Sequence, residues 1–461
     1  MILLDGRKNK GKRKGEENMT QTTAYQKPVT LKSILAFAAP TMAMSLFMSF
    51  YTMVDGLFVS NYIGSSALAA VNLTAPVIQL ITAVSAMLAA GGSAVIMKKM
   101  GQQKEAEARQ DFTFLILVNV AVGLLLCGAG YLLIDRLPAL MNLSAQSAAY
   151  CAEYLSRYLL FTVPILLMNN FTLYLIASEK SALSLICSVC GGLLNILLDY
   201  IFIAKLGLGL GAAAVATGLG YSVTAVVGLA VFSRRSSLLH FVKPVFRLST
   251  LVSSASNGCS EMATSLVSGV VTLLFNWTML RYVGEDGVAA VTIIMYVLMF
   301  ASSLYTGYSY GVAPMVSYYY GEQNREKLKK LVSLSLKTVG IVSLAVAALS
   351  FVAAGPLVSI FVRPDDPVYS LALRGNRLCS LALLFIGFNI FASGLFTALS
   401  NGVISAVLAF SRSFVFMSAA MLALPAMLGV DGVWLATPAA ELAAFLLSAL
   451  TLIKYRKRYH Y

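Results

Sequence analysis

Long apolar runs without charged residues alternate with short polar segments along almost the whole chain. A membrane-spanning helix needs about 20 mostly apolar residues. The runs therefore predict twelve spanning helices, over residues 33–58, 68–97, 112–134, 154–178, 182–204, 208–232, 252–280, 288–318, 335–360, 377–399, 403–424 and 432–453. Because this number is even, both termini are expected on the same side of the membrane.

The composition indicates an all-α polytopic membrane protein. Hydrophobic residues make up 58% of the 461 residues and charged residues 12%, whereas soluble domains carry about 25% charged residues. This excludes a soluble globular enzyme, a disordered protein and a coiled coil. The net charge of +14 would suggest a nucleic-acid partner if the basic residues formed one patch. They lie instead in short segments between apolar runs, so we expect no nucleic-acid partner.

Lys and Arg are distributed unevenly between the two sides that the twelve spans define. Twenty-six of them fall on the side of the termini and seven on the other side. Because cytoplasmic loops carry an excess of Lys and Arg, both termini are predicted in the cytoplasm, with the chain in a bacterial or archaeal cytoplasmic membrane. Residues 1–30 and 454–461 are then basic tails, the first of them expected to be disordered. The sequence leaves open whether translation starts at Met1 or Met19.

A shift of 220 residues aligns the two halves of the chain. Gly91 falls on Gly311 and Gly101 on Gly321, and the polar loop KKMGQQKEAEARQ falls on YYYGEQNREKLKK without a gap. A six-span unit that is duplicated with the same starting side is a parallel repeat, whose halves are related by an axis along the membrane normal. We therefore expect two six-helix lobes related by a pseudo-two-fold axis, with an N-lobe over 31–232, a linker over 233–251 and a C-lobe over 252–453.

An ionisable residue inside a span costs about 2.5–3.5 kcal/mol on insertion scales, so each one indicates a functional site. The predicted spans hold Asp55, Asp199, Glu261, Arg412 and Glu441. Asp199 follows Asn195 by one helical turn on the same face, and the next span carries Thr217. Asp55 lies in the same half of the membrane as Asp199. Together these oxygen atoms would bind H⁺ or Na⁺; alternatively, each carboxylate is satisfied separately by a donor near the membrane surface.

The second half of the chain offers a weaker candidate site. Glu261 lies in the inner half of the seventh span and has no acidic partner, since the repeat places Phe275 opposite Asp55. It serves either a function or a structural hydrogen bond. Arg412 and Glu441 are expected to pair with each other, in a structural role rather than a substrate-binding one. The many Met and Tyr residues suit an adaptable apolar cavity, although Met is also common in membrane cores.

Several of these segments resemble the multidrug and toxic compound extrusion (MATE) transporters, and more closely their MepA-like branch. The resemblance rests on AAPTMAMSLFMSFYTMVDGLFVSNYIG, which has Pro40 fifteen residues before Asp55, and on the Gly101 and Gly321 loops. It also rests on LLNILLDYIF and on EMATS at the start of the second half, and it covers nearly the whole chain from about residue 30.

The resemblance implies a monomeric antiporter without a cofactor, which exports small amphipathic, often cationic, drugs through the lipid membrane in exchange for Na⁺ or H⁺. The family's N-lobe ion site matches Asp55, Asn195, Asp199 and Thr217, with Pro40, Tyr51, Tyr154 and Asn169 in the surrounding cavity. Glu261 matches the acidic residue of span seven that some members use for coupling. This chain has no carboxylate between Arg377 and Arg412 in span ten, so the N-lobe site is the stronger prediction.

Two other functions remain as alternatives. A flippase of lipid-linked oligosaccharide or of a lipid precursor would need a strongly cationic cavity for pyrophosphate, whereas the spans offer only Arg412. An intramembrane aspartyl protease would need Tyr-Asp and Gly-x-Gly-Asp motifs, whereas the chain has Val54-Asp55 and Leu198-Asp199-Tyr200. We therefore predict a transporter without catalytic residues.

Overall fold

The computed structural model describes residues 24–58, 62–63, 65–134, 136 and 145–461, and for residues 24, 55–58, 65–70, 72 and 145 it describes the backbone alone. The first half of the chain forms the 3-10 helix η1 (Ala24–Gln26), α1 (Leu31–Phe58), α2 (Ser65–Gly101), α3 (Glu105–Ile134), α5 (Ala145–Leu159), α6 (Thr162–Ala177), α7 (Ser181–Asp199), the π-helix η3 (Tyr200–Lys205) and α8 (Leu210–Phe232).

The second half repeats this succession of long helices. It forms α9 (Leu248–Tyr282), α10 (Glu285–Gly321), α11 (Arg325–Val352), α12 (Ala354–Ser359), α13 (Pro367–Cys379), the 3-10 helix η4 (Ser380–Ala382), α14 (Leu383–Ala398), α15 (Gly402–Phe410), the π-helix η5 (Ser411–Phe416), α16 (Met417–Leu428) and α17 (Val430–Tyr459). Within the described residues, eleven helices are long and apolar enough to cross a membrane, and the bent pair α5–α6 brings the number to twelve.

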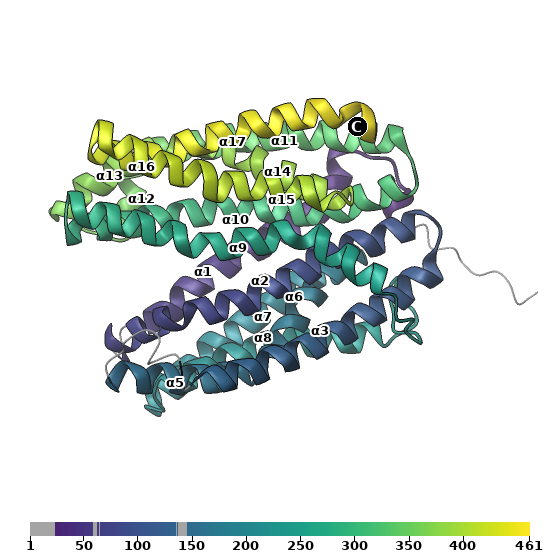
Figure 1. Ribbon diagram of the computed structural model, residues 1–461, viewed down its shortest axis with the longest axis horizontal. Coiled ribbons are helices and arrows are strands. Elements are labelled where there is room, and N and C mark those ends of the chain that lie inside the picture. The colour runs from purple at the N-terminus through teal and green to yellow at the C-terminus, as the bar shows by residue number, and fades with distance from the viewer. Residues whose placement is uncertain (1–23, 59–61, 64, 135, 137–144) are drawn as a thin grey trace, which may run out of the picture.

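The helices form two lobes that correspond to the two halves of the sequence (Figure 1). Helices α1–α8 make the N-lobe and α9–α17 make the C-lobe. The lobes lie together at the end of the molecule that holds the C-terminus and spread apart towards the other end (Figure 1). We call the first of these the basic end, because the Lys and Arg residues at the end of α17 lie there. The same end holds the turns at 101–104, 178–180, 321–324 and 399–401. The predicted all-α, two-lobe architecture is confirmed.

The fourth span is broken rather than continuous as expected over 154–178. Its two helices, α5 and α6, meet at an angle of 54°. Pro164 stands in the first turn of α6. Proline has no N–H to donate and its ring clashes with the carbonyl four residues earlier, which lies at Leu160 in the break. The break is therefore encoded locally by Pro164.

The fifth and eleventh spans each contain a π-helical segment. Asp199 directly precedes η3 and Arg412 lies within η5. π-Helical turns are rare and occur frequently at functional sites. Each lobe thus places a charged residue of its membrane interior at an irregular turn, which the apolar pattern alone does not predict.

The turns at the basic end repeat between the lobes, as the sequence alignment predicts. Gln103 and Gln323 both adopt left-handed backbone conformations, with φ of 62° and 56°. A Cβ atom at Gly101 would lie 2.0 Å from the Tyr318 carbonyl oxygen, and one at Gly321 would lie 2.0 Å from the Lys98 carbonyl oxygen. The two contacts are related by the same 220-residue shift, so the lobes meet across the pseudo-two-fold axis.

The interface between the lobes is built from close helix crossings. In α1, Thr41 Oγ1 donates a hydrogen bond to the Gly307 carbonyl oxygen of α10 at 2.6 Å. Further from the basic end, Ser49 Oγ lies 2.6 Å from Ser303 Oγ. Small residues let membrane helices approach closely, and glycines supply this closeness here. Pro40 lies inside α1 one residue before the Thr41 contact.

Three expected boundaries change. α9 begins at Leu248, so the linker is 233–247 rather than 233–251, because the Thr250 and Leu251 amides already bond to the Arg247 carbonyl oxygen. The tail expected to be disordered over 1–30 is ordered from residue 24 onwards, because Tyr25 is fully buried; residues 1–23 lie outside the described residues. The C-terminal segment 454–461 continues α17 as far as Tyr459.

Candidate functional site

The predicted N-lobe site is assembled from α7 and α8. Asn195 and Asp199 are buried one turn apart in α7, with 1% and 0% of their surface exposed. Asn195 Nδ2 donates to Thr217 Oγ1 of α8 at 3.4 Å, and the Thr217 hydroxyl donates to the Ala213 carbonyl oxygen at 3.0 Å. The structure therefore brings Asn195 and Thr217 together, and Asp199 follows Asn195 one turn later in α7.

Glycines allow this close approach of α7 and α8. A Cβ atom at Gly191 would lie 2.5 Å from the Gly220 carbonyl oxygen. Any larger side chain at Gly191 would separate the two helices and pull Asn195 away from Thr217. The polar cluster therefore depends on the small residues around it.

A small cavity adjoins the Asn195–Thr217 contact. Its volume is about 10 Å³, which is room for about one water molecule. Tyr51 of α1 lines it, and the Tyr51 hydroxyl donates to the Tyr221 hydroxyl of α8 at 2.7 Å. The amide and hydroxyl oxygens around this space are the type of ligand that binds a hard cation such as Na⁺. They can equally form hydrogen bonds to a protonated water molecule.

Other N-lobe predictions meet different outcomes. The side chain of Asp55 lies outside the described residues, so its proximity to Asp199 stays a prediction. Tyr154 is buried in α5 and stacks on Tyr158. Asn169 is half-buried in α6, and its Nδ2 donates to the Ile165 carbonyl oxygen at 3.4 Å. In the described part of the chain, neither Tyr154 nor Asn169 lines the cavity beside Asn195.

The C-lobe holds a much larger cavity, of about 530 Å³. We call it the C-lobe cavity. It brings together all three charged residues predicted for this lobe, and its described lining is Glu261, Thr264, Ser268, Val271, Thr272, Met295, Leu298, Met299, Ser302, Thr306, Ser309, Tyr310, Asn389, Ile390, Ser393, Ala409, Arg412, Ser413, Met417 and Glu441. A volume of this size accommodates a drug-sized molecule.

Arg412 and Glu441 form the predicted ion pair on one wall of the C-lobe cavity. Arg412 Nε lies 2.8 Å from Glu441 Oε1. The second carboxylate oxygen of Glu441 accepts a hydrogen bond from Asn389 Nδ2 at 2.7 Å, and Ser448 Oγ in turn donates to Asn389 Oδ1 at 3.1 Å. The Glu441 charge is therefore neutralised and its oxygens are satisfied.

Glu261 is held differently on another wall of the same cavity. The Tyr310 hydroxyl donates to its carboxylate at 3.4 Å, and among the described residues no Lys, Arg or His lies within ion-pair distance of it. Because the charges of Arg412 and Glu441 cancel, Glu261 gives the C-lobe cavity one net negative charge when its carboxyl group is ionised.

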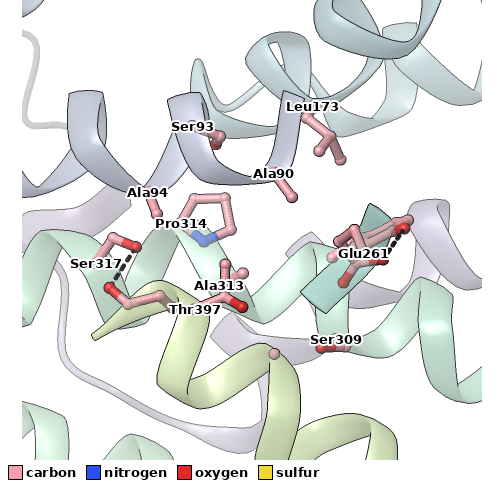
Figure 2. Close-up of a pocket in the computed structure, with 13 residues that line it drawn as sticks. Ala90, Ser93, Ala94, Leu173, Glu261, Ser309, Ala313, Pro314, Ser317 and Thr397 are labelled. Carbon is pink, nitrogen blue, oxygen red and sulfur yellow. Dashed lines mark hydrogen bonds between the residues drawn. The ribbon is translucent and has the colours of Figure 1, made fainter. Parts of the chain in front are cut away.

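A narrow cavity of about 30 Å³ leads from Glu261 to the boundary between the lobes. Figure 2 shows Ala90 and Ser93 of α2 on one side of it, Pro314 of α10 on the other and Glu261 at its edge. This is room for about two water molecules. Glu261 therefore lies where the C-lobe cavity approaches the N-lobe.

Sequence reasoning missed Tyr221, Tyr310 and Asn389. The repeat held a signal for two of them, since a shift of 220 places Asn389 opposite Asn169 and Glu441 opposite Tyr221. Tyr310 corresponds to Ala90 and had no such signal. Its role becomes visible only when α9 and α10 are packed side by side.

The fold and these two polar sites define a polytopic membrane transporter built from two six-helix lobes. Comparison with known sequences identifies its kind. The chain belongs to the MatE family, whose sequence model matches residues 40–201 and 262–421, more than half of the chain. Since members of this family are transporters, the protein is a transporter and not an enzyme.

Known relatives match over nearly their whole length. The chain is 22% identical to the multidrug export protein MepA of Staphylococcus haemolyticus (strain JCSC1435) over 92% of this chain and 93% of the relative. A MATE crystal structure in complex with MaL6 aligns with a TM-score of 0.86 and 24% identity, covering 92% of this chain and 96% of that one. The outward-facing conformation of a multidrug resistance MATE family transporter of the MOP superfamily gives the same score, identity and coverage.

Proposed function

We propose that the protein is a cation-coupled antiporter that exports amphipathic, cationic compounds by alternating access, with H⁺ or Na⁺ as the coupling ion. The observation that carries the proposal is the C-lobe cavity, which combines drug-sized volume with one uncompensated carboxylate. The similarity to a multidrug export protein supports the export of drugs. The protein would act as a monomer without a cofactor in the cell membrane.

The lining of the C-lobe cavity suits an amphipathic cation. Met295, Met299 and Met417 supply flexible apolar contacts that adapt to different shapes, while Glu261 supplies the charge. A lipid pyrophosphate would instead require a free cation. In the described lining the only guanidinium is that of Arg412, and Glu441 neutralises it. This argues against a flippase of lipid-linked precursors.

The N-lobe cluster is the proposed coupling site. Asp199 is fully buried and lies one turn from Asn195 in α7, and a carboxylate inside a membrane span indicates a functional site. We include Asp55 as the second carboxylate, on the basis of its sequence position alone. Because Tyr51 of α1 lines the adjoining cavity, binding of an ion there would act on α1, the helix that packs against α10 of the other lobe.

Alternating access follows from the relation between the lobes. They meet at the basic end and spread at the other end, an arrangement that supports an outward-open state with the basic end in the cytoplasm (Figure 1). An ion shifts the balance of states only through its different affinity for each state. We propose that external H⁺ or Na⁺ binds the N-lobe site in this state and favours release of the cargo.

The test is transport by the purified protein in liposomes loaded with a fluorescent cationic dye. Na⁺ and pH gradients are imposed separately, with the membrane potential clamped. We expect at least one gradient to drive the dye against its own concentration gradient. If neither gradient drives dye movement faster than in dye-loaded liposomes without the protein, the proposal is wrong.

A further inference from the structure

The N-terminal segment fills a cleft between the lobes at the basic end. The Tyr25 hydroxyl donates to the Ala177 carbonyl oxygen of the N-lobe at 2.6 Å. The Tyr25 ring stacks on Tyr318 of the C-lobe, with 4.8 Å between ring centroids, and also contacts Phe37 of α1 at 5.5 Å. Lys327 Nζ donates to the Tyr25 carbonyl oxygen at 3.4 Å. One aromatic side chain thus occupies the space between α1, α6 and α10.

The pseudo-two-fold axis relates this filled cleft to an open one between α2 and α9. The open cleft has a volume of about 480 Å³. Under the 220-residue shift, the aromatic residues around Tyr25 correspond to polar residues that line the open cleft. Tyr318 corresponds to Lys98, Tyr319 to Lys99 and Phe37 to Asn257. The linker does not fill this space, because its residues Val242 and Arg247 bind α3 instead.

The open cleft differs in chemistry from its filled counterpart. Besides the lysines and Asn257, hydroxyl and amide groups of Gln102, Ser253, Ser256 and Ser400 line it, and no carboxylate is among its described lining residues. Lys99 Nζ is already paired with Asp111. Lys98 is half-buried, and within the described structure no carboxylate lies within ion-pair distance of it; its ammonium lies 5.0 Å from the Tyr320 ring. A half-buried cation beside unoccupied polar space calls for an anion.

The surroundings of the open cleft suit an amphipathic anion better than a free one. Val252, which lines the cleft, is 59% exposed, and Leu248, one turn earlier in α9, is 72% exposed. Phe246 at the end of the linker is 78% exposed. Apolar side chains next to the polar cleft offer contact to an acyl chain. The basic residues 7–14 of the N-terminal tail would be repelled by the two lysines, so that segment of the chain is a poor occupant.

We propose that this cleft binds the headgroup of an anionic phospholipid, with its phosphate at Lys98 and its acyl chain along Leu248 and Val252. Basic pockets between membrane helices on the cytoplasmic side are typical sites for such headgroups. The lipid contacts α2 of the N-lobe and α9 of the C-lobe, so it holds the lobes together on the side of the axis that Tyr25 does not reach. This site is independent of what the protein exports.

The experiment follows thermal unfolding of the full chain in detergent micelles during three titrations. These use short-chain phosphatidylglycerol, phosphatidylcholine of the same chain length, and inorganic phosphate. A ligand that binds the folded state raises the unfolding midpoint as its concentration rises. We expect phosphatidylglycerol to raise the midpoint at concentrations where phosphatidylcholine and phosphate have little effect.

Variants locate the effect. Lys98→Gln is expected to weaken the apparent affinity for phosphatidylglycerol about fivefold. Lys330→Gln removes the same charge from an exposed position of the basic end and is expected to respond like wild type. Ser253→Phe keeps both lysines but fills the cleft, and is expected to lose the response. An unchanged response in Lys98→Gln or in Ser253→Phe overturns the site, and a full shift with inorganic phosphate alone overturns the choice of lipid.

Discussion

Glu261 is the one carboxylate of the C-lobe cavity that no described cation neutralises. When ionised it gives the cavity its net charge, and among the described residues the Tyr310 hydroxyl is its hydrogen-bond partner, at 3.4 Å. Glu441 lies in the same lining but is already paired with Arg412. The two glutamates therefore differ in whether a cation neutralises them, because Glu441 has Arg412 beside it and Glu261 has the Tyr310 hydroxyl.

Replacing Glu261 with Gln keeps the shape of the cavity and removes its charge. We expect KM for a monovalent cationic dye to rise about tenfold, equivalent to about 1.4 kcal/mol, while KM for an uncharged amphipathic substrate stays unchanged. Initial rates of export from proteoliposomes measure both. Glu326→Gln, on the exposed first turn of α11, is the matched control. Equal effects on the charged and uncharged substrates would contradict the role of the charge.

Arg412 is predicted to stabilise the fold rather than bind cargo. Removing one partner of a buried ion pair leaves an uncompensated charge, and this typically costs about 3 kcal/mol or more. We expect Arg412→Met to lower the free energy of unfolding by about this amount, and the double variant with Glu441→Gln to recover most of the loss. Equilibrium unfolding in mixed micelles measures the free energy of unfolding of both variants and of wild type. A double variant no more stable than Arg412→Met would rule out the explanation.

At the scale of the elements, the contact between the lobes at the basic end depends on Gly101 and Gly321. Their Cα atoms face the carbonyl oxygens of Tyr318 and Lys98 in α10 and α2, with no space for a side chain. Backbone atoms cannot move aside as a flexible side chain can. The closed basic end is therefore sensitive to a single methyl group.

Gly321→Ala is expected to open the basic end. Its Cβ atom would lie 2.0 Å from the Lys98 carbonyl oxygen, so α2 and α10 must separate. Spin labels at positions 104 and 325, on exposed sites of the two lobes, should show a larger share of long distances. Gly128→Ala, where nothing lies within 4 Å of the new atom, is the control. The same distance distribution in Gly321→Ala and wild type would show that this contact does not close the molecule.

The apolar pattern predicts the number and order of spans well, because membrane burial requires length and hydrophobicity in each segment separately. It misses irregularities inside them. The break between α5 and α6 had a local signal in Pro164. The π-helices η3 and η5 had none that we recognise, since π-helical hydrogen bonding depends on the packing of neighbouring helices.

For the whole molecule, the sequence repeat predicts two related lobes, and the matching turns and glycine contacts agree with it. The sites were only partly predictable. Asn195 and Asp199 share a helix face, so periodicity places them together, and the rarity of membrane charges pointed to the pair Arg412–Glu441. Tyr310 reaches Glu261 from a different helix, and the C-lobe cavity that both residues line exists only through tertiary packing. No pattern along one helix encodes such a space.

The proposed coupling site and the proposed cargo cavity lie in different lobes. Coupling then requires that an ion in the N-lobe changes how that lobe packs against the C-lobe. α1 is the element placed to do this, because Tyr51 lines the N-lobe cavity and Thr41 bonds to Gly307 of α10. Substitution at the ion site should therefore uncouple transport without changing the C-lobe cavity.

The most direct test is ion-driven dye transport by Asp199→Asn in proteoliposomes, compared with wild type and with Asp431→Asn. The substitution keeps size and removes the charge, and Asp431, which pairs with Arg374 in the C-lobe, lies outside both sites. We predict that Asp199→Asn still binds the dye with wild-type affinity but loses acceleration by either ion gradient, while Asp431→Asn transports normally. Undiminished gradient-driven transport by Asp199→Asn would contradict the account.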